Sequence, residues 1–285
     1  MAGQFCISID LELAWGIWDK LSDEYVALCS KLERQIVERL LGSFNKYEIS
    51  ATWAIVGSLL ADPQPRSGGA DDVWYAPDLI EAIRSSRTPQ EIGSHSFAHI
   101  YFPQSSAEEV RRDLEAAQSI HTENDLAFAS FVFPRNMVAH EAALAGSGIK
   151  VFRSVDRGWY ISVARANRYA GRVANLLDKV LPIAPATVRP IRHANGLVEL
   201  PSSMLLMGRN GARRLISSRV TTRKARLGLE AASRKGEVFH LWFHPSNFYH
   251  STEVQLNTLD RILQVAAEMR ERGDLEIVPM GAFAA

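Results

Sequence analysis

Cysteine is scarce in this chain of 285 residues, where only Cys6 and Cys29 occur. Two thiols cannot hold a chain of this size together, which excludes the disulfide-rich secreted class. The sequence also lacks a run of 18 apolar residues, so it predicts no transmembrane helix. The first ten residues contain no basic region and reach an acid at Asp10, unlike a secretory signal peptide. We therefore expect a reduced, cytoplasmic protein.

Net charge is also lacking, because 32 Lys and Arg balance 32 Asp and Glu. A zero sum argues against a general nucleic-acid-binding protein. The charges are nevertheless unevenly placed. Residues 126–236 hold 19 basic and 5 acidic residues, whereas residues 1–125 hold 10 and 20, and residues 237–285 hold 3 and 7. Such a separation produces a field that attracts anionic ligands toward the middle of the chain.

Short apolar runs alternate with longer helical patterns along the sequence. Strands are predicted at 5–10, 51–56, 91–93, 131–133, 151–153, 197–200, 238–243 and 275–278. Helices are predicted at 25–47, 77–86, 106–122, 138–146, 162–177, 211–234 and 252–271. The turn-rich stretch 61–72 is predicted to be a surface loop. Regular β–α alternation implies parallel strands with crossover helices, and hence an α/β barrel or a distorted relative of one.

The first candidate site is an acidic motif at the end of the first predicted strand. Side chains alternate along a strand, so Ser8, Asp10 and Glu12 share one face. Two acids that end an apolar strand are costly to bury without a partner, and a metal ion or an arginine would supply one. The alternative is an ordinary solvated strand end.

A histidine pair forms the second candidate site. His95 and His99 are four residues apart, so on a helical turn both imidazoles face one side. That spacing suits two ligands on one divalent ion. A metalloprotease would need Glu directly after the first histidine, where this chain has Ser96. The alternative is a pair of capping or surface histidines.

Three more motifs follow later strands. Arg135 comes after an apolar strand and Pro134, and its guanidinium could hold a carboxylate by two hydrogen bonds unless it is a surface arginine. The segment 156–159 follows the next strand. His244 ends the strand 238–243, whereas His240, deeper in that strand, is interpreted as a core histidine.

Together these motifs resemble the polysaccharide deacetylase family, carbohydrate esterase family 4. The motifs, in chain order, are Asp10-Leu11-Glu12, Ser50 to Gly57, His95-Ser96-Phe97-Ala98-His99, Pro134-Arg135, Asp156 to Trp159 and Leu241-Trp242-Phe243-His244. The resemblance implies a single-domain distorted (β/α) barrel of about seven parallel strands over residues 1–285. The family usually has two adjacent acids in its first motif. The spacing of Asp10 and Glu12 is more similar to the allantoinase-like and peptidoglycan deacetylase branches.

The resemblance also implies roles for the motif residues. Glu12, His95 and His99 would bind a divalent metal ion, in most relatives zinc, with an open position for water and substrate. Asp10 would take a proton from the water, and Arg135 would orient Asp10 and keep it ionised.

The remaining roles concern the leaving group and the substrate. His244 would protonate the leaving amine, and Asp156 would hold His244. Trp159 and Trp242 would contact the substrate, with Trp159 as a wall of the acyl pocket.

The predicted reaction is removal of an N-acetyl group from an amino sugar during biosynthesis of a surface polysaccharide or glycoconjugate. Two alternatives remain at this point: the same metal chemistry on a formamido sugar or cyclic ureide, and a non-catalytic carbohydrate-binding protein on this fold. Nine basic residues and one acid lie between 209 and 235. They are either a solvated helical face or a sign of an anionic or lipid-linked carbohydrate substrate, which would bring peripheral contact with an anionic membrane.

Overall fold

One curled, mostly parallel sheet organises the chain, and the computed structural model describes residues 2–61 and 71–284. Most of the predicted surface loop 61–72 lies outside the described residues. Seven parallel strands adjoin in the order β7-β5-β4-β3-β2-β1-β9. Their bounds are β1 (Gly3–Leu11), β2 (Thr52–Ile55), β3 (Glu91–Ser94), β4 (Ser130–Val132), β5 (Val151–Ser154), β7 (Val198–Pro201) and β9 (Val238–Phe243).

Three shorter strands complete the sheet in the described part of the chain. β8 (Met204–Leu205) lies parallel to β9, β10 (Leu275–Ile277) lies parallel to β1, and β6 (Ile191–Arg192) lies antiparallel to β7. The predicted α/β class and distorted barrel are confirmed. β10 corresponds to the predicted strand 275–278, whereas β6 and β8 were not predicted, because two residues are too few to show alternation.

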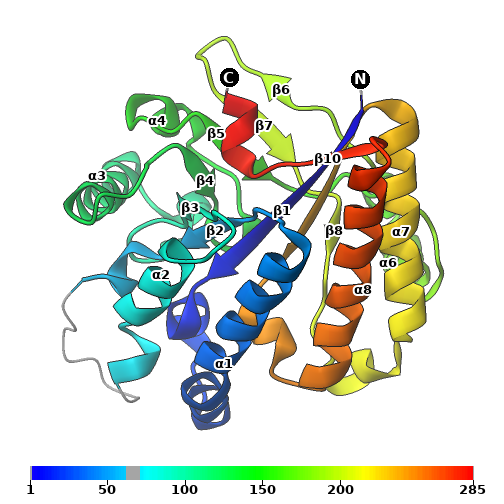
Figure 1. Cartoon of the computed structure of the whole chain (residues 1–285). Coiled ribbons are helices and arrows are strands. Elements are labelled where there is room, and N and C mark those ends of the chain that lie inside the picture. The colour runs from blue at the N-terminus through cyan, green and yellow to red at the C-terminus, as the bar shows by residue number, and fades with distance from the viewer. Residues whose placement is uncertain (1, 62–70, 285) are drawn as a thin grey trace.

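The two ends of the sheet are joined by consecutive residues between β7 and β8. The Ser202 backbone N–H donates to Ser154 on β5 (3.1 Å), and the next N–H, of Ser203, donates to His240 on β9 (2.9 Å). A single stretch of chain therefore touches both edges of the sheet, which curls it into a distorted (β/α) barrel with helices outside (Figure 1).

Eight helices are described. They are α1 (Asp23–Tyr47), α2 (Pro77–Arg84), α3 (Ala107–Glu123), α4 (Glu141–Gly146), α5 (Trp159–Ala166), α6 (Arg168–Val180), α7 (Ser218–Lys235) and α8 (Thr252–Glu271). α1, α8 and α7 lie side by side outside the sheet (Figure 1). Local signals fix several ends: Ser22 caps α1, and Ser106 with Glu109 forms a capping box on α3.

Three predicted helices differ from the observed ones. The helix expected at 162–177 is two helices, because Asn167 is extended and its side chain caps α6 through Tyr169 and Ala170. The helix expected at 211–234 starts with a 3₁₀ turn, η6 (Gly211–Leu215), and Ser217 caps the later α7. The helix expected at 138–146 is shorter in the structure, where α4 covers only Glu141–Gly146.

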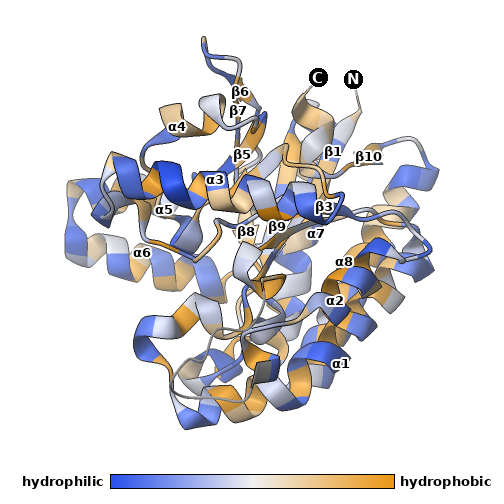
Figure 2. Cartoon of the chain, turned by 90° about the vertical axis from the view of Figure 1, so that its left-hand side faces the viewer, coloured by the Kyte–Doolittle hydropathy of each residue, from blue (hydrophilic) through white to orange (hydrophobic). Residues whose placement is uncertain are grey.

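The segment 155–216 is the most open part of the described structure. Its large, well-exposed apolar side chains are Val155, Trp159, Tyr169, Val173, Leu176, Leu177, Val180, Leu181 and Leu215. Figure 2 shows hydrophobic and hydrophilic residues interleaved on α5 and α6. Among the described helices, none combines the length and the hydropathy that crossing a membrane requires.

Candidate metal centre and its surroundings

The carboxyl end of β1 brings two acids into the protein interior. Asp10 is 2% exposed and Glu12, the first residue after β1, is 8% exposed. β1 has neighbours on both sides, β2 and β9, so the sheet surrounds this end with other strand ends. Gly16 makes room for Glu12, since a Cβ at position 16 would stand 2.1 Å from a Glu12 carboxylate oxygen.

The histidine pair follows β3, on a loop and not on the helical turn that its spacing predicted. Ser96 and His99 take left-handed backbone conformations, with φ of 70° and 52°. The Asp113 carboxylate on α3 holds this loop by accepting the backbone N–H groups of Phe97 and Ala98, both at 2.9 Å. The turn of the loop brings both imidazoles to one place. The prediction that they lie on one side is therefore confirmed, whereas the predicted helical turn is wrong.

Glu12, His95 and His99 converge on one point. The Nε2 atoms of His95 and His99 lie 3.3 and 3.1 Å from Oε2 of Glu12. One ligand atom from each of the three residues lies within 4.8 Å of the others, and all three residues are buried. Nδ1 of His95 donates to the carbonyl oxygen of Val132 (2.8 Å), which leaves the Nε2 lone pair facing Glu12.

The chemistry of these donors fits a divalent metal ion. Neither Nε2 atom, nor Nδ1 of His99, has a hydrogen-bond partner among the described residues. Burial lowers the pKa of His99, which favours the neutral imidazole that binds metals. Burial opposes ionisation of Glu12, but His244, His95 and His99 together lower its pKa well below its usual value. Two imidazoles and one carboxylate form a three-ligand set typical of catalytic zinc.

Asp10 is held by an arginine that sequence reasoning did not select. Arg153 on β5 is fully buried, and its two terminal nitrogens donate to the two Asp10 carboxylate oxygens at 2.7 and 2.6 Å. The same guanidinium donates to Asn136 and Ser8, both at 2.9 Å, and lies 4.3 Å from the centre of the Trp242 ring. Burial alone would raise the pKa of Asp10, but the charge and hydrogen bonds of Arg153, together with His95 and His244, lower it.

The expectation that Arg135 orients Asp10 is wrong. Arg135 has a left-handed backbone (φ 56°), and its guanidinium donates to Asp19 at 2.7 Å and lies 5.0 Å from the Tyr101 ring centre. The turn after Pro134 directs this side chain toward the surface segment that follows β1. Arg153 was the better candidate, because an arginine inside an apolar strand needs a buried carboxylate.

His244 reaches the site from the end of β9. Its Nε2 lies 3.6 Å from an Asp10 oxygen and 3.5 Å from a Glu12 oxygen. The expectation that Asp156 holds His244 is wrong: the Asp156 carboxylate accepts from the Gly158 N–H (2.8 Å) and the Tyr160 hydroxyl (2.6 Å) and so closes its own turn.

The two tryptophans occupy different places. Trp242 on β9 lies between the site and a pocket of about 260 Å³, with the Arg153 guanidinium on its ring and the His244 ring 5.6 Å away. Trp159 lines the same pocket, is 39% exposed and donates from Nε1 to Asp178 (2.9 Å). His240 is a core histidine as interpreted. It bonds Ser8 at 2.9 Å, and burial lowers its pKa to about 3.

Comparison with known proteins agrees with this arrangement. The polysaccharide deacetylase family model matches residues 22–137, which include both histidines of the metal site. The resemblance to the polysaccharide deacetylases is confirmed. No curated protein matches this chain significantly. Polysaccharide deacetylases hydrolyse carbon–nitrogen bonds other than peptide bonds, and the match of residues 22–137 supports the predicted hydrolase class.

Solved structures extend the likeness in fold to the whole chain. A putative polysaccharide deacetylase from Mycobacterium smegmatis is 16% identical, with a TM-score of 0.67 over 100% of this chain and 90% of its own. A probable polysaccharide deacetylase from Pseudomonas aeruginosa PAO1 is 12% identical, with a TM-score of 0.67 over 99% and 89%. Puue allantoinase is 11% identical, with a TM-score of 0.67 over 99% and 88%. Asp10, Glu12 and His244 lie outside the segment that the family model matches, and the fold brings them to the histidines.

Proposed function

We propose that this protein is a divalent-metal-dependent deacetylase that removes an N-acetyl group from an amino sugar. The observation that carries the proposal is the convergence of Glu12, His95 and His99 beside an ionised Asp10 and the strand-terminal His244. A ligand set, a base and an acid thus lie within a few ångströms of one another, as amide hydrolysis requires.

The residues divide the chemistry between them. Glu12, His95 and His99 would hold a divalent ion, for which Zn²⁺ is our first choice, and that ion would polarise the amide carbonyl and acidify water. Asp10 accepts the water proton, and Arg153 keeps the Asp10 carboxylate ionised and fixed by two hydrogen bonds. His244 donates a proton to the leaving nitrogen as the carbon–nitrogen bond breaks. Acetate and a free amino sugar result.

A second candidate reaction is hydrolysis of a cyclic ureide. It is favoured by the one-residue spacing between Asp10 and Glu12 and by the likeness in fold to an allantoinase. A formamido sugar is a closely related alternative, since the same machinery would release formate.

The setting of the reaction is also a proposal. We place it in the cytoplasm, in the biosynthesis of a surface polysaccharide or glycoconjugate, with residues 1–285 as one catalytic domain. Its partner is a carbohydrate and not a nucleic acid. Peripheral contact with an anionic membrane, through the basic residues of η6 and α7, is part of the same proposal.

Metal analysis followed by a substrate panel tests the proposal. We expect about one divalent ion per chain, and acetate release from at least one N-acetylated sugar, lipid-linked sugar or nucleotide sugar. The Asp10→Asn variant should keep the ion and lose the activity, which makes it the matched control for contaminating hydrolases. Release of ammonia or an open-chain ureide from cyclic ureides, without acetate from any sugar, would replace deacetylation by the second candidate. Absence of bound metal after reconstitution would refute the ligand set.

A further inference from the structure

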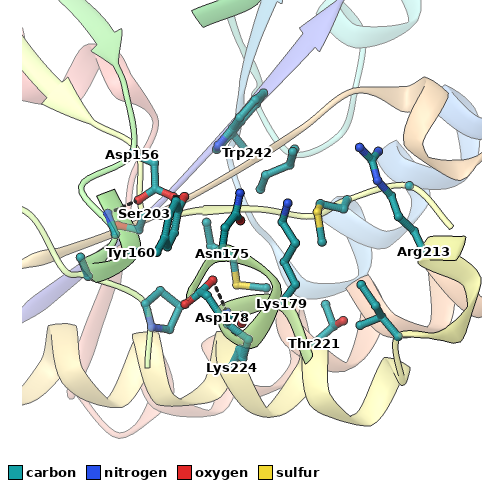
Figure 3. A pocket seen from close by; sticks show the side chains of 18 of the residues that line it. Asp156, Tyr160, Asn175, Asp178, Lys179, Ser203, Arg213, Thr221, Lys224 and Trp242 are labelled. Carbon is teal, nitrogen blue, oxygen red and sulfur yellow. Dashed lines mark hydrogen bonds and ion pairs between the residues drawn. The ribbon is translucent and has the colours of Figure 1, made fainter. Parts of the chain in front are cut away.

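A pocket of about 260 Å³ is lined in part by Trp242, whose ring also lies against Arg153 and near His244 of the proposed catalytic site. Its walls come from α5 and α6, from the segment around β8, from η6 and from α7 (Figure 3). None of the proposed metal ligands, base or acid lines this pocket. It is therefore a second compartment next to the site, and the proposed reaction leaves it unused.

The lining of the pocket carries more positive than negative charge. Its cationic residues are Lys179, Arg209, Arg213 and Lys224, and its acidic residues are Asp156 and Asp178. Lys224 is 7% exposed in its side chain and is paired with Asp178 at 2.7 Å, which ties α7 to α6. The guanidinium of Arg209 donates to the carbonyl oxygens of Ile216 and Arg214, both at 2.6 Å. These contacts build the walls.

Lys179 and Arg213 are different, because neither side chain has a hydrogen bond or ion pair within the described chain. Lys179 reaches into the pocket from α6 and Arg213 from η6 (Figure 3). Burial and the neighbouring Arg213 charge both lower the pKa of Lys179. The two cations repel each other, and the Asp178 carboxylate, which attracts Lys179, is already paired with Lys224.

The position of Trp242 connects this pocket to the proposed reaction. One part of its ring lies against Arg153, the partner of Asp10, and its ring centre is 5.6 Å from that of His244. The same residue lines the pocket with Lys179 and Arg213. A ligand that spans Trp242 would place one group at the metal ligands and another at the two cations.

We propose that this pocket binds a phosphate group carried by the amino-sugar substrate. The inference rests on the proposed deacetylase function and names its substrate class. A phosphate monoester carries close to two negative charges at pH 7, matching the two unpaired cations, and an arginine with a lysine is a recurrent phosphate-binding combination. Asn175 and Thr221 in the lining add neutral hydrogen-bond groups. A sugar 1-phosphate is such a monoester, and a nucleotide sugar and a lipid-linked sugar phosphate present the same anionic phosphate oxygens in esters that are linked at both ends.

Binding of the reaction products tests the proposal without depending on turnover. Calorimetric titration of the metal-loaded protein with glucosamine 1-phosphate and with glucosamine should show clearly tighter binding of the phosphate. In a Lys179→Gln, Arg213→Gln double variant, we expect binding of the phosphate to fall at least about 10-fold, while binding of glucosamine stays unchanged. The matched control is Arg219→Gln with Arg223→Gln, which removes two charges of η6–α7 that do not line the pocket. It should bind like the wild type.

Kinetics then distinguish the sources of the phosphate. N-Acetylglucosamine, its 1-phosphate, its uridine diphosphate ester and a polyprenyl phosphate-linked form in detergent micelles form the substrate series. The ester with the largest drop in kcat/KM in the pocket variant identifies the natural attachment. Equal loss in the control variant would show general electrostatic steering and overturn a local subsite, as would unchanged phosphate binding in the pocket variant.

Failure of this proposal differs from failure of the proposed function. If acetate is released from neutral and phosphorylated sugars at equal kcat/KM, the deacetylase stands and the phosphate subsite does not. If glucosamine 1-phosphate binds in a manner that depends on Lys179 and Arg213 but no acetylated sugar is hydrolysed, the subsite stands and the reaction is another one. Circular dichroism and metal content confirm that each variant is folded, and the single variants serve if the double variant is not.

Discussion

The site at the strand ends and the segment 155–216 differ in the burial and pairing of their charged side chains. At the strand ends the central charged groups are buried and have partners, as with Asp10 on Arg153 and Glu12 beside His95 and His99. In the segment 155–216, apolar side chains are exposed and Lys179 has no partner in the described chain. The contrast indicates that strands fix the reacting groups, whereas helices and turns outside the sheet are left free to select a substrate.

The strongest test of the buried site at the strand ends removes one of the proposed metal ligands. His95→Ala and His99→Ala should each lower metal affinity by more than about 100-fold and abolish turnover, because two remaining ligands hold a divalent ion poorly. The measurement is metal per chain after dialysis, with His250→Ala, an exposed histidine, as the control. Stoichiometric metal in both variants would show that the ligand set is wrong.

The two arginines allow a direct comparison of the buried and exposed environments. Arg153→Met leaves the Asp10 carboxylate buried without its partner, and we expect a loss of about 3–5 kcal/mol in the free energy of unfolding together with loss of activity. Arg135→Met removes a partly exposed pair with Asp19 and should cost less than about 1 kcal/mol. Urea unfolding of both variants measures the difference. Equal losses would contradict the assignment of Arg153 as the partner of Asp10.

His244 should matter only when the leaving group needs a proton. His244→Gln should keep the metal and reduce kcat on an N-acetyl amide by about 100-fold or more. On an acetate ester of 4-nitrophenol the reduction should be much smaller, since that leaving group departs as a stable anion. A similar loss on both substrates would assign His244 to orientation or metal binding instead.

The smallest expected effect concerns a buried acid away from the site. Burial raises the pKa of Glu33 on α1 to about 7, although the Tyr249 hydroxyl donates to it at 2.6 Å. An acid with a raised pKa in the folded state adds stability that is complete below its usual pKa of about 4.3 and is lost as the pH rises through about 7.

Glu33→Gln should therefore weaken the dependence of folding stability on pH in this range. Thermal unfolding between pH 5 and 8.5 measures it. We expect the melting temperature of the wild type to fall relative to that of the variant as the pH increases. The corresponding loss in the free energy of unfolding is on the order of 2 kcal/mol. Parallel curves would mean that Glu33 does not change its protonation in this range.

The sequence predicted the parts of the fold that depend on local patterns. Strand 238–243 and helix 252–271 were placed at their observed bounds, because alternation and the 3.6-residue period are strong there. The grouping of Glu12, His95 and His99 was also predicted, from the resemblance to the polysaccharide deacetylases.

What could not be predicted depends on how strands far apart in the sequence align. Arg135 and Arg153 both stand near the ends of neighbouring strands, and only the curl of the sheet shows which of them faces Asp10. The left-handed conformation of His99 is equally invisible in the sequence, because Asp113 on another element holds its loop. The orientation of Asp156 could not be predicted either, because its side chain closes a local turn that leaves no periodic pattern in the sequence.

The central place of β1 has a consequence for synthesis. Its neighbours β2, β9 and β10 come from residues 52–55, 238–243 and 275–277, so β9 and β10 are synthesised long after β1 (Figure 1). A ribosome must reach residues 238–243 before β1 is covered on both sides. Until then its apolar side chains stay exposed, and a nascent or truncated chain is a substrate for chaperones and proteases. Loss of residues 238–285, which contain β9, α8 and β10, should thus leave unfolded polypeptide, not a weakened enzyme.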